Sequence, residues 1–237
     1  MAAERAVVVG VVAGRGGGGA STLAALLARA FSRRTATVLV DLDPSAAGID
    51  LLVGLEEADG VRWPDLLGAG EDVPGADVLA LLPRWGSCAV LSADRSRPAV
   101  LDPTVVADVL HALASAVGVL VLDLDRGAVT GGGAVGYGCD EVLIVAPRDL
   151  RTVAGVLAMR PGLLEWGADV GLALRGPAPG GLAADDVARA VGLPVRGVLP
   201  YDRGLAAAVE RAGLPRTGRL VRAVQRIADS SQAGAGR

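Results

Sequence analysis

The sequence predicts a single α/β domain in which a doubly wound, mostly parallel sheet is flanked by helices on both faces. Short apolar runs alternate with segments of helical periodicity along the chain, an order typical of such sheets. Of the 237 residues, 51% are hydrophobic and only 3% are aromatic, so Ala, Val and Leu must build the core. This composition suits buried parallel strands and is ample for a domain that needs no disulfide or structural metal.

The apolar runs predict strands near residues 6–12, 36–41, 78–82, 118–123, 141–146, 169–175 and 195–199. Helices are expected near 21–33, 104–116, 150–164, 182–191, 203–212 and 218–229. Two connections, 43–77 and 127–138, carry clustered Pro, Gly or acidic residues and are expected to be irregular. The domain would therefore occupy residues 1–229, and residues 230–237, rich in Ser, Gly and Ala, would form a disordered tail.

Charge and cysteine usage narrow the class of protein. The net charge of −3 argues against broad affinity for nucleic acid, although residues 203–237 carry seven arginines against Glu210 and Asp229. Cys88 and Cys139 lack CxxC spacing, so we expect them to lie reduced in the core of a cytoplasmic protein. No apolar run reaches the roughly 18 residues that a membrane span requires.

A glycine-rich loop follows the first predicted strand and opens the first helix, over Gly14–Thr22. Backbone N–H groups of such a loop can converge on phosphate oxygens, and the start of the helix adds electrostatic attraction. A standard phosphate loop ends in Gly-Lys-Ser/Thr, in which the lysine neutralises phosphate and the hydroxyl reaches Mg²⁺. Here Ala20 takes the position of the lysine, and all 23 basic side chains of the chain are arginines. The sequence keeps the cradle and lacks its main cation.

Acidic residues end two of the predicted strands. Asp41 and Asp43 close the strand at 36–41, and Asp123 closes the strand at 118–123. In an open α/β sheet these carboxyl ends form the edge where ligands bind. Carboxylates there can hold Mg²⁺ through water or orient an attacking water, as phosphoryl transfer requires. Helix capping and ordinary turns remain the alternative for all three.

The segment Gly14–Thr22 resembles the deviant Walker A loop of the MinD/ParA ATPases, which have a P-loop NTPase-like fold. The resemblance puts Arg15 on the family's signature lysine, which reaches the partner's nucleotide across a dimer, and Ser21 on the hydroxyl that binds Mg²⁺. Asp41-Leu42-Asp43 with residues 48–54 resembles the second strand and switch I, which implies that Asp43 positions the hydrolytic water. Asp123 falls on the Walker B acid, and residues 197–202 resemble the turn that borders adenine.

The resemblance implies ATP or ADP with Mg²⁺ as cofactor. Nucleotide contacts are implied for Gly14, Arg15, Gly16, Gly17, Gly18, Gly19, Ala20, Ser21, Thr22, Arg175, Pro200, Tyr201 and Asp202. Ser21, Asp41 and Asp123 would hold the metal, and Asp43 and Arg15 would be catalytic. Arg175 stands where the family usually has asparagine, and glycines replace the expected switch II sequence after Asp123. The missing lysine predicts weak or absent ATP hydrolysis.

The resemblance extends from residue 6 to about residue 229, and residues 14–17, 62–66 and 175–182 are most similar to the CpaE/TadZ-like branch, including its actinobacterial septum-site-determining members. It implies a homodimeric localisation or scaffolding factor for a Tad-type pilus or secretion apparatus, or for the septum. Its partners would be a pilus or secretion ATPase or septum-associated proteins. Recruitment to the pole or septum would involve only indirect membrane contact. Members often carry a receiver-like amino-terminal domain, which we expect to be absent or trimmed here.

Two other classes remain open. Gly14-x-Gly16-x-x-Gly19, with Asp41 downstream, also fits the fingerprint of an NAD-dependent Rossmann oxidoreductase, although a helix that begins at Ser21-Thr22 is not typical of that class.

The second alternative is a DNA-binding, ParA-like partition protein, or a membrane-binding protein of the MinD type. The last predicted helix carries Arg219, Arg222 and Arg226 on one face and Leu220, Val224 and Ile227 on the other. The simpler interpretation is a helix that packs on the sheet with a solvated basic face. We therefore expect no nucleic-acid partner and no salt-resistant binding to membranes.

Overall fold

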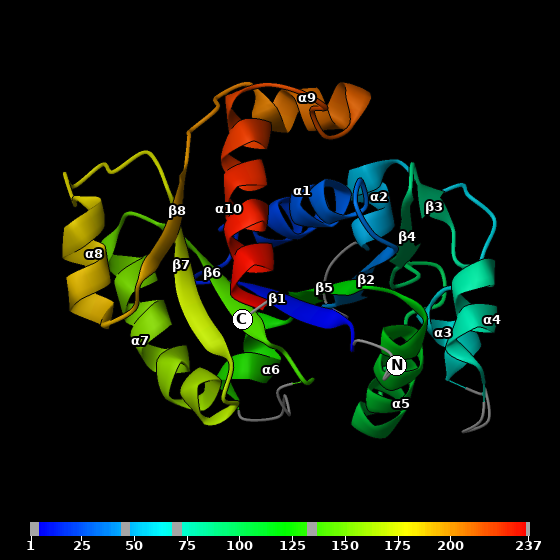
Figure 1. Ribbon diagram of the computed structural model, residues 1–237. Helices are drawn as coiled ribbons and strands as arrows, with labels where there is room; N and C mark the ends of the chain where they lie inside the picture. Colours follow the sequence, from blue (N-terminus) through cyan, green and yellow to red (C-terminus); the bar gives the residue numbers. More distant parts are fainter. Residues whose placement is uncertain (1–4, 44–47, 68–72, 132–136, 236–237) are drawn as a thin grey trace.

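The computed structural model describes residues 5–43, 48–67, 73–131 and 137–235. They form one eight-stranded sheet in the order β3-β4-β2-β5-β1-β6-β7-β8, parallel except for the short edge strand β3. The strands are β1 Val7–Ala13, β2 Thr37–Leu42, β3 Arg84–Trp85, β4 Cys88–Leu91, β5 Val119–Leu124, β6 Glu141–Pro147, β7 Asp169–Arg175 and β8 Val195–Leu199. The predicted doubly wound α/β fold is confirmed, with helices on both faces (Figure 1).

Two hydrophobic cores lie on the two faces of the sheet. One packs under α1 Ala20–Phe31, α2 Ile49–Val53, α9 Leu205–Ala212 and α10 Arg219–Ala235. The other packs under α3 Trp63–Leu66, α4 Gly75–Leu81, α5 Pro103–Ala116, α6 Arg126–Thr130, α7 Leu150–Glu165 and α8 Ala184–Val191. Cys88 and Cys139 are buried free thiols, as predicted, and burial raises the pKa of each to about 12.

One predicted strand is wrong. Residues 78–82 belong mainly to helix α4, and the strand beside β2 on the side away from β5 is β4, Cys88–Leu91. A short apolar run does not distinguish a buried strand from one face of a helix. In α4, Val78 is buried while Leu81 is 59% exposed, which is the pattern of a helix with one covered face.

Helices also occupy segments that the sequence assigns to loops or to the tail. Helices α2 and α3 lie within 43–77, and α6 begins the glycine-rich connection, whose residues 132–136 are outside the described part. Helix α10 continues to Ala235, so most of the predicted disordered tail is helical here. Capping explains α6, because the Asp125 carboxylate accepts hydrogen bonds from the N–H groups of Gly127 and Ala128.

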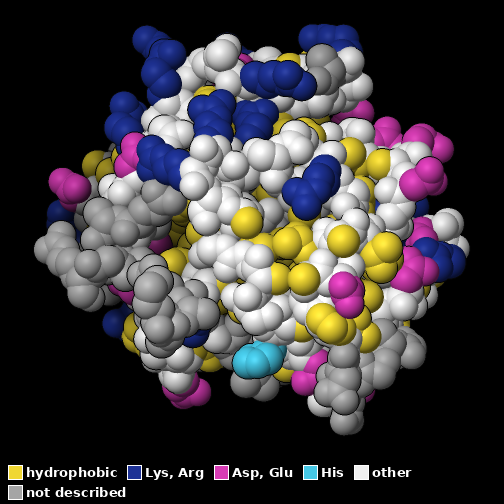
Figure 2. Space-filling view, turned by 45° about the vertical axis from the view of Figure 1, so that its right-hand side comes forward, with side chains coloured by type: hydrophobic (Ala, Val, Ile, Leu, Met, Phe, Trp, Pro, Cys, Tyr) yellow, Lys and Arg dark blue, Asp and Glu magenta, His cyan; other side chains and the backbone are white. Residues whose placement is uncertain are grey.

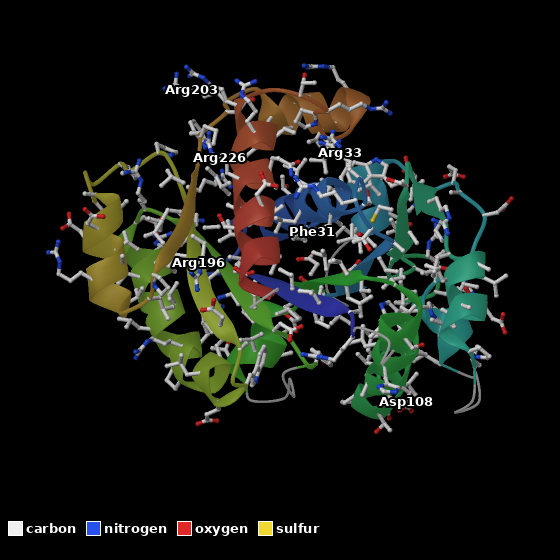
Figure 3. All side chains as sticks on the ribbon, in the orientation of Figure 1. Phe31, Arg33, Asp108, Arg196, Arg203 and Arg226 are labelled. Atoms are coloured by element: carbon white, nitrogen blue, oxygen red, sulfur yellow. The ribbon has the colours of Figure 1, made fainter. Side chains whose placement is uncertain are left out.

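The last helix packs as its sequence pattern predicts. Leu220, Val224 and Ile227 are buried against α1 and β8, and the basic residues on the opposite face are exposed. Figure 2 shows arginine side chains gathered at the end of the molecule that carries α9. Figure 3 places Arg203 and Arg226 toward this end and Asp108 at the opposite end. We call the exposed residues Arg203, Arg211, Arg219, Arg222 and Arg226 the basic surface.

Candidate phosphate-binding site

The predicted phosphate loop joins β1 to α1 at the carboxyl end of the sheet. The Gly14 N–H donates to the carbonyl oxygen of Val145 in β6 at 2.9 Å, and the Gly18 N–H donates to the Arg15 carbonyl at 3.1 Å. Gly17 and Gly19 have φ of 67° and 100°, a left-handed conformation that glycine adopts without steric cost. A Cβ atom at Gly16 or Gly17 would meet no atom within 4 Å, so the space beside these two residues is open.

The start of α1 has no side-chain cap for its first amide donors. Gly19 is the N-cap residue, and no side chain caps the helix. The first N–H groups of a helix have no partner inside it, and together with the helix dipole they favour an anion. Ala20, in the lysine position, is buried. The loop therefore presents backbone donors without an ammonium group from its own sequence.

Ser21, in the first turn of α1, and Asp123, in β5, lie close to each other. The Ser21 hydroxyl is near enough to the carboxylate of Asp123, in β5 next to β1, to lower the pKa of that carboxylate. Asp123 also stands opposite Asp41 in the pairing of β2 with β5. Burial, together with the negative charges of Asp41 and Asp43, raises the pKa of Asp123 to about 7. A divalent cation would relieve this repulsion, so the Ser21 and Asp123 oxygens fit the proposed Mg²⁺.

The Asp41 carboxylate is already engaged by its own chain. One oxygen accepts from the Asp43 N–H at 3.1 Å, and the other accepts from the Ile49 N–H at 2.8 Å and lies 3.4 Å from the Ser92 hydroxyl. Burial raises the pKa of Asp41, against the effect of these backbone hydrogen bonds. Its contacts fit a carboxylate that fixes the start of α2, and its role as a metal ligand stays a prediction. Among the described residues, no group of three or more His, Cys, Asp or Glu side chains could hold a metal ion.

Asp43 lies at the end of the described part of the β2 connection. It lines a cavity of about 210 Å³ whose walls also include Asp41, Trp63, Arg95 and Leu101. The charge of Asp43 acts on both Asp41 and Asp123, which places the three carboxylates in one cluster. The predicted role of Asp43, to orient a hydrolytic water, is not tested by this arrangement.

Arg15 is paired within its own chain. Its guanidinium contacts the Asp149 carboxylate at 2.9 Å from both Nε and Nη2, and Nη1 donates to the Gly16 carbonyl at 3.1 Å. The other Asp149 oxygen caps α7 by accepting from the Thr152 N–H and hydroxyl. Burial raises the pKa of Asp149, but the hydrogen bonds from Thr152 and Arg15 outweigh this effect and hold the pKa below its ordinary value. The predicted reach of Arg15 across a dimer would require this ion pair to open.

The residues predicted to border adenine line one small cavity. Arg175 at the end of β7 and Pro200, Tyr201 and Asp202 after β8 meet Gly19, Thr22 and Leu23 of the loop and α1. The structure thus brings together residues that lie far apart in the sequence and that the resemblance assigns to a nucleotide site. The cavity measures about 50 Å³, enough for only a few water molecules, and Arg175 narrows it by donating to the Gly18 carbonyl at 2.9 Å.

Sequence reasoning missed the contacts that hold residues 48–54, the segment that resembles switch I. Arg62 is buried, and its guanidinium lies 3.5 Å from the Asp50 carboxylate while it also donates to the carbonyls of Leu55 and Ala58 at 2.9 and 3.2 Å. The Trp63 indole N–H donates to the Asp41 carbonyl at 2.6 Å. The only signal in the sequence was an Arg-Trp-Pro-Asp-Leu segment, which indicates a short capped helix but not its partners.

The strand order bears on the dinucleotide alternative. In that fold the acid that ends the second strand reaches the ribose beside the glycine loop, because the second strand neighbours the first. Here β5 lies between β1 and β2, so Asp41 is displaced from the loop by one strand. The topology therefore disfavours the Rossmann interpretation.

Comparison of folds defines the class. A ParA family ATPase from Chlorobium tepidum has a TM-score of 0.78 at 18% identity and covers 94% of this chain and 98% of its own. MinD of Aquifex aeolicus, solved in complex with MinC, has a TM-score of 0.78 at 18% identity over 96% of both chains. The septum site-determining protein MinD of Pyrococcus horikoshii, solved with Mg-ADP, has a TM-score of 0.77 at 17% identity over 98% of both. The chain has the fold of the MinD and ParA ATPases.

Sequence comparison adds a nearer pair of relatives. Two uncharacterized proteins from two strains of Mycobacterium tuberculosis are 42% identical over 207 residues, which is 87% of this chain. The chain spans 58% of the length of these relatives. No protein-family model matches the chain. None of the described helices has the length and apolar content that crossing a bilayer requires.

Proposed function

We propose that the chain is a degenerate MinD/ParA-type nucleotide-binding protein with weak or absent ATP hydrolysis. The observation that supports this most strongly is the open loop at the start of α1, which keeps its backbone donors and the Ser21–Asp123 pair while Ala20 replaces the lysine. The amides of residues 16–22 would hold the phosphate tail. Ser21 and Asp123 would hold Mg²⁺, which screens phosphate charge when bound. Asp43 would orient water for any residual hydrolysis.

The missing lysine sets the expected rate. A transition-state cation at the phosphates contributes several powers of ten in such reactions, and no ammonium group exists in this chain to replace it. Binding depends less on that single group, because several amides and a metal share the phosphate charge. We therefore expect the site to bind nucleotide more readily than it hydrolyses it.

Calorimetry of the purified protein with Mg-ATP and Mg-ADP tests binding, and steady-state phosphate release tests hydrolysis. We expect saturable binding with phosphate release close to background. Asp43→Ala serves as the hydrolysis variant, and Asp59→Ala, which removes an exposed carboxylate, is its matched control. Rapid turnover that Asp43→Ala abolishes and Asp59→Ala preserves would contradict the proposal, as would the absence of any nucleotide binding.

In the cell, we propose, the protein acts as a localisation or scaffolding factor for a Tad-type pilus or secretion apparatus, or for the septum, and acts as a homodimer. The support is the sequence resemblance to the CpaE/TadZ-like branch together with the MinD/ParA fold. Without the lysine, dimer formation need not depend on ATP. Light scattering with and without Mg-ATP tests this point: a monomer under both conditions would count against the dimer.

The basic surface makes DNA binding the second candidate. Its five arginines are all exposed, and Figure 3 places Arg203 and Arg226 toward the end of the molecule that carries α9. Against it stand the net charge of −3 and the small number of basic residues available for phosphate contacts. We expect no DNA retention and no sedimentation with anionic vesicles at physiological salt. Salt-resistant binding in either assay would favour the partition or membrane alternative, and saturable binding of NADH alone would favour the oxidoreductase.

A further inference from the structure

The positive charges around the phosphate loop are not equivalent. Arg15 belongs to the loop, but Nε and Nη2 of its guanidinium both contact one oxygen, Oδ2, of Asp149. That carboxylate neutralises it, and the other Asp149 oxygen fixes the start of α7 by accepting from Thr152. Arg15 can offer its charge to a ligand only if it leaves Asp149. A cation that replaces the missing lysine would therefore have to come from an element other than the loop.

Arg175 occupies the other side of the loop. It ends β7, two strands away from β1, and its half-buried side chain crosses the end of β6 to reach the loop. Nη1 donates to the Gly18 carbonyl at 2.9 Å. The same atom lies 3.0 Å from where a Cβ of Gly19 would stand, so the guanidinium sits directly against the residue before Ala20.

Arg175 forms no ion pair within the part of the chain that the structure describes, although Asp202 lines the same cavity. None of the ion pairs among these residues includes Arg175, whereas Arg15, Arg62 and Arg196 all have carboxylate partners. The contact with Gly18 uses one of the five N–H donors of the guanidinium. The remaining donors can serve phosphate oxygens, for which the planar fork of arginine is well suited.

We propose that Arg175 is the phosphate-binding cation of this site and takes over, from β7, the role of the lysine that Ala20 replaces. The ligand class follows from this assignment: a polyphosphate tail held by the amides of the loop, with Arg175 against its flank. The small volume of the adjoining cavity supports the same conclusion, because at about 50 Å³ it contributes little room for a base while Arg175 keeps its present place. The proposal rests on the nucleotide-binding function and names the side chain that provides its ionic part.

The test is calorimetry of the full chain with Mg-ATP and with Mg-tripolyphosphate, which has the phosphate tail but no base. We expect Arg175→Gln to weaken both ligands about 10- to 100-fold, the range of one charge-assisted hydrogen bond. Arg222→Gln, which removes an exposed arginine of α10, is the control for a lost positive charge and should leave both affinities within about 2-fold. The unfolding midpoint of each variant shows whether the fold is kept.

Rescue makes the assignment specific. Ala20→Lys in the Arg175→Gln background should recover most of the lost affinity, and it should gain much less in the wild-type background, where Arg175 already supplies the charge. Arg175→Lys keeps a charge with fewer donors and should bind at an intermediate level. If Arg175→Gln fails to fold, the Arg175→Lys and Ala20→Lys variants still decide the question. The proposal would be overturned if Ala20→Lys changed the affinity for Mg-tripolyphosphate by the same factor in the wild type and in Arg175→Lys.

The outcomes separate this proposal from the one on which it rests. If the wild type binds Mg-ATP and Arg175→Gln binds it equally well or better, Arg175 only fills the cavity and this inference fails alone. If Arg175→Gln weakens Mg-ATP and leaves Mg-tripolyphosphate unchanged, the residue recognises the nucleoside and the inference also fails. If the wild type binds neither ligand, the nucleotide-binding function itself is overturned.

Discussion

Replacing Asp123 by asparagine should stabilise the protein at neutral and alkaline pH. The carboxylate is only 3% exposed, and burial together with Asp41 and Asp43 raises its pKa from 3.8 to about 7. Each pKa unit corresponds to about 1.4 kcal/mol. The charged form therefore costs up to about 4 kcal/mol of unfolding free energy, most of it from desolvation.

The sign follows from the protons bound in each state. Between pH 3.8 and about 7 the folded protein retains a proton on Asp123 that the unfolded chain has lost. The stabilising contribution of this proton is therefore full below pH 3.8. It falls as the pH rises from 3.8 and is lost once the pH has passed about 7. Asp123→Asn removes that dependence, so it should match the wild type near pH 4 and exceed it at pH 8.

Urea unfolding at pH 4.5, 6 and 8 measures this difference. The advantage of Asp123→Asn should grow steadily across the three conditions and reach about 2–4 kcal/mol at pH 8. Asp108→Asn, an exposed aspartate on α5 (Figure 3), controls for the change of residue type and should show no such trend. A stability difference for Asp123→Asn that is the same at all three pH values would refute the reasoning.

Three further substitutions probe the packing around the site, each by urea unfolding. Arg62→Ala removes the buried cation beside Asp50 and leaves only the exposed Arg95 to pair with this buried carboxylate, so it should lower the unfolding free energy by about 3–5 kcal/mol. Gly75→Ala should cost about 1–3 kcal/mol although alanine favours helices, because its Cβ would stand 1.8 Å from the Ala112 carbonyl oxygen and force α4 away from α5. Asp149→Ala removes the cap of α7 and an ion pair and should cost about 1–2 kcal/mol.

Each has a matched control in the chain. Arg95 contacts the same Asp50 carboxylate as Arg62, but from an exposed position. Arg95→Ala is therefore the control for Arg62→Ala and should lower the unfolding free energy by at most about 1 kcal/mol. Gly180→Ala enters open space and should be nearly neutral, so an equal effect at both glycines would contradict the steric argument. Asp102→Ala removes only the cap of helix α5. It should lower the unfolding free energy by less than Asp149→Ala does, and the difference should equal the contribution of the Arg15–Asp149 ion pair.

The sheet, the loop and the acidic strand ends could be predicted because their signals are local. An apolar run followed by glycines and a helical pattern is read within about twenty residues, and parallel strands then bring the ends of β2 and β5 to the same edge. The strand predicted at 78–82 is wrong because its local signal is an apolar run too short to distinguish the period of a strand from that of a helix. The replacement strand, β4, has only four residues, Cys88–Leu91.

The contacts that define the site's electrostatics could not be predicted from one sequence. The partners of Arg15 and Arg175 lie 134 and 157 positions away. Nothing in the sequence distinguishes the aspartate that neutralises Arg15 from the many acidic residues that do not. Pairing of this kind depends on which strands are neighbours, and only the sheet order supplies that information.

The charges on the two sides of the loop are opposite in sign, and this bears on how a ligand would be held. On one side Asp41, Asp43 and Asp123 form a cluster of carboxylates whose mutual repulsion raises the pKa of Asp123 beyond the effect of burial. On the other side Arg175 carries a positive charge with no carboxylate partner among the described residues. A lysine at position 20 would place a cation between them, and alanine does not. A phosphate tail would therefore be attracted on the Arg175 side and repelled by the carboxylates on the other side. A divalent cation bound to the carboxylate oxygens would remove this repulsion. The metal is therefore more important here than in a site that keeps the P-loop lysine.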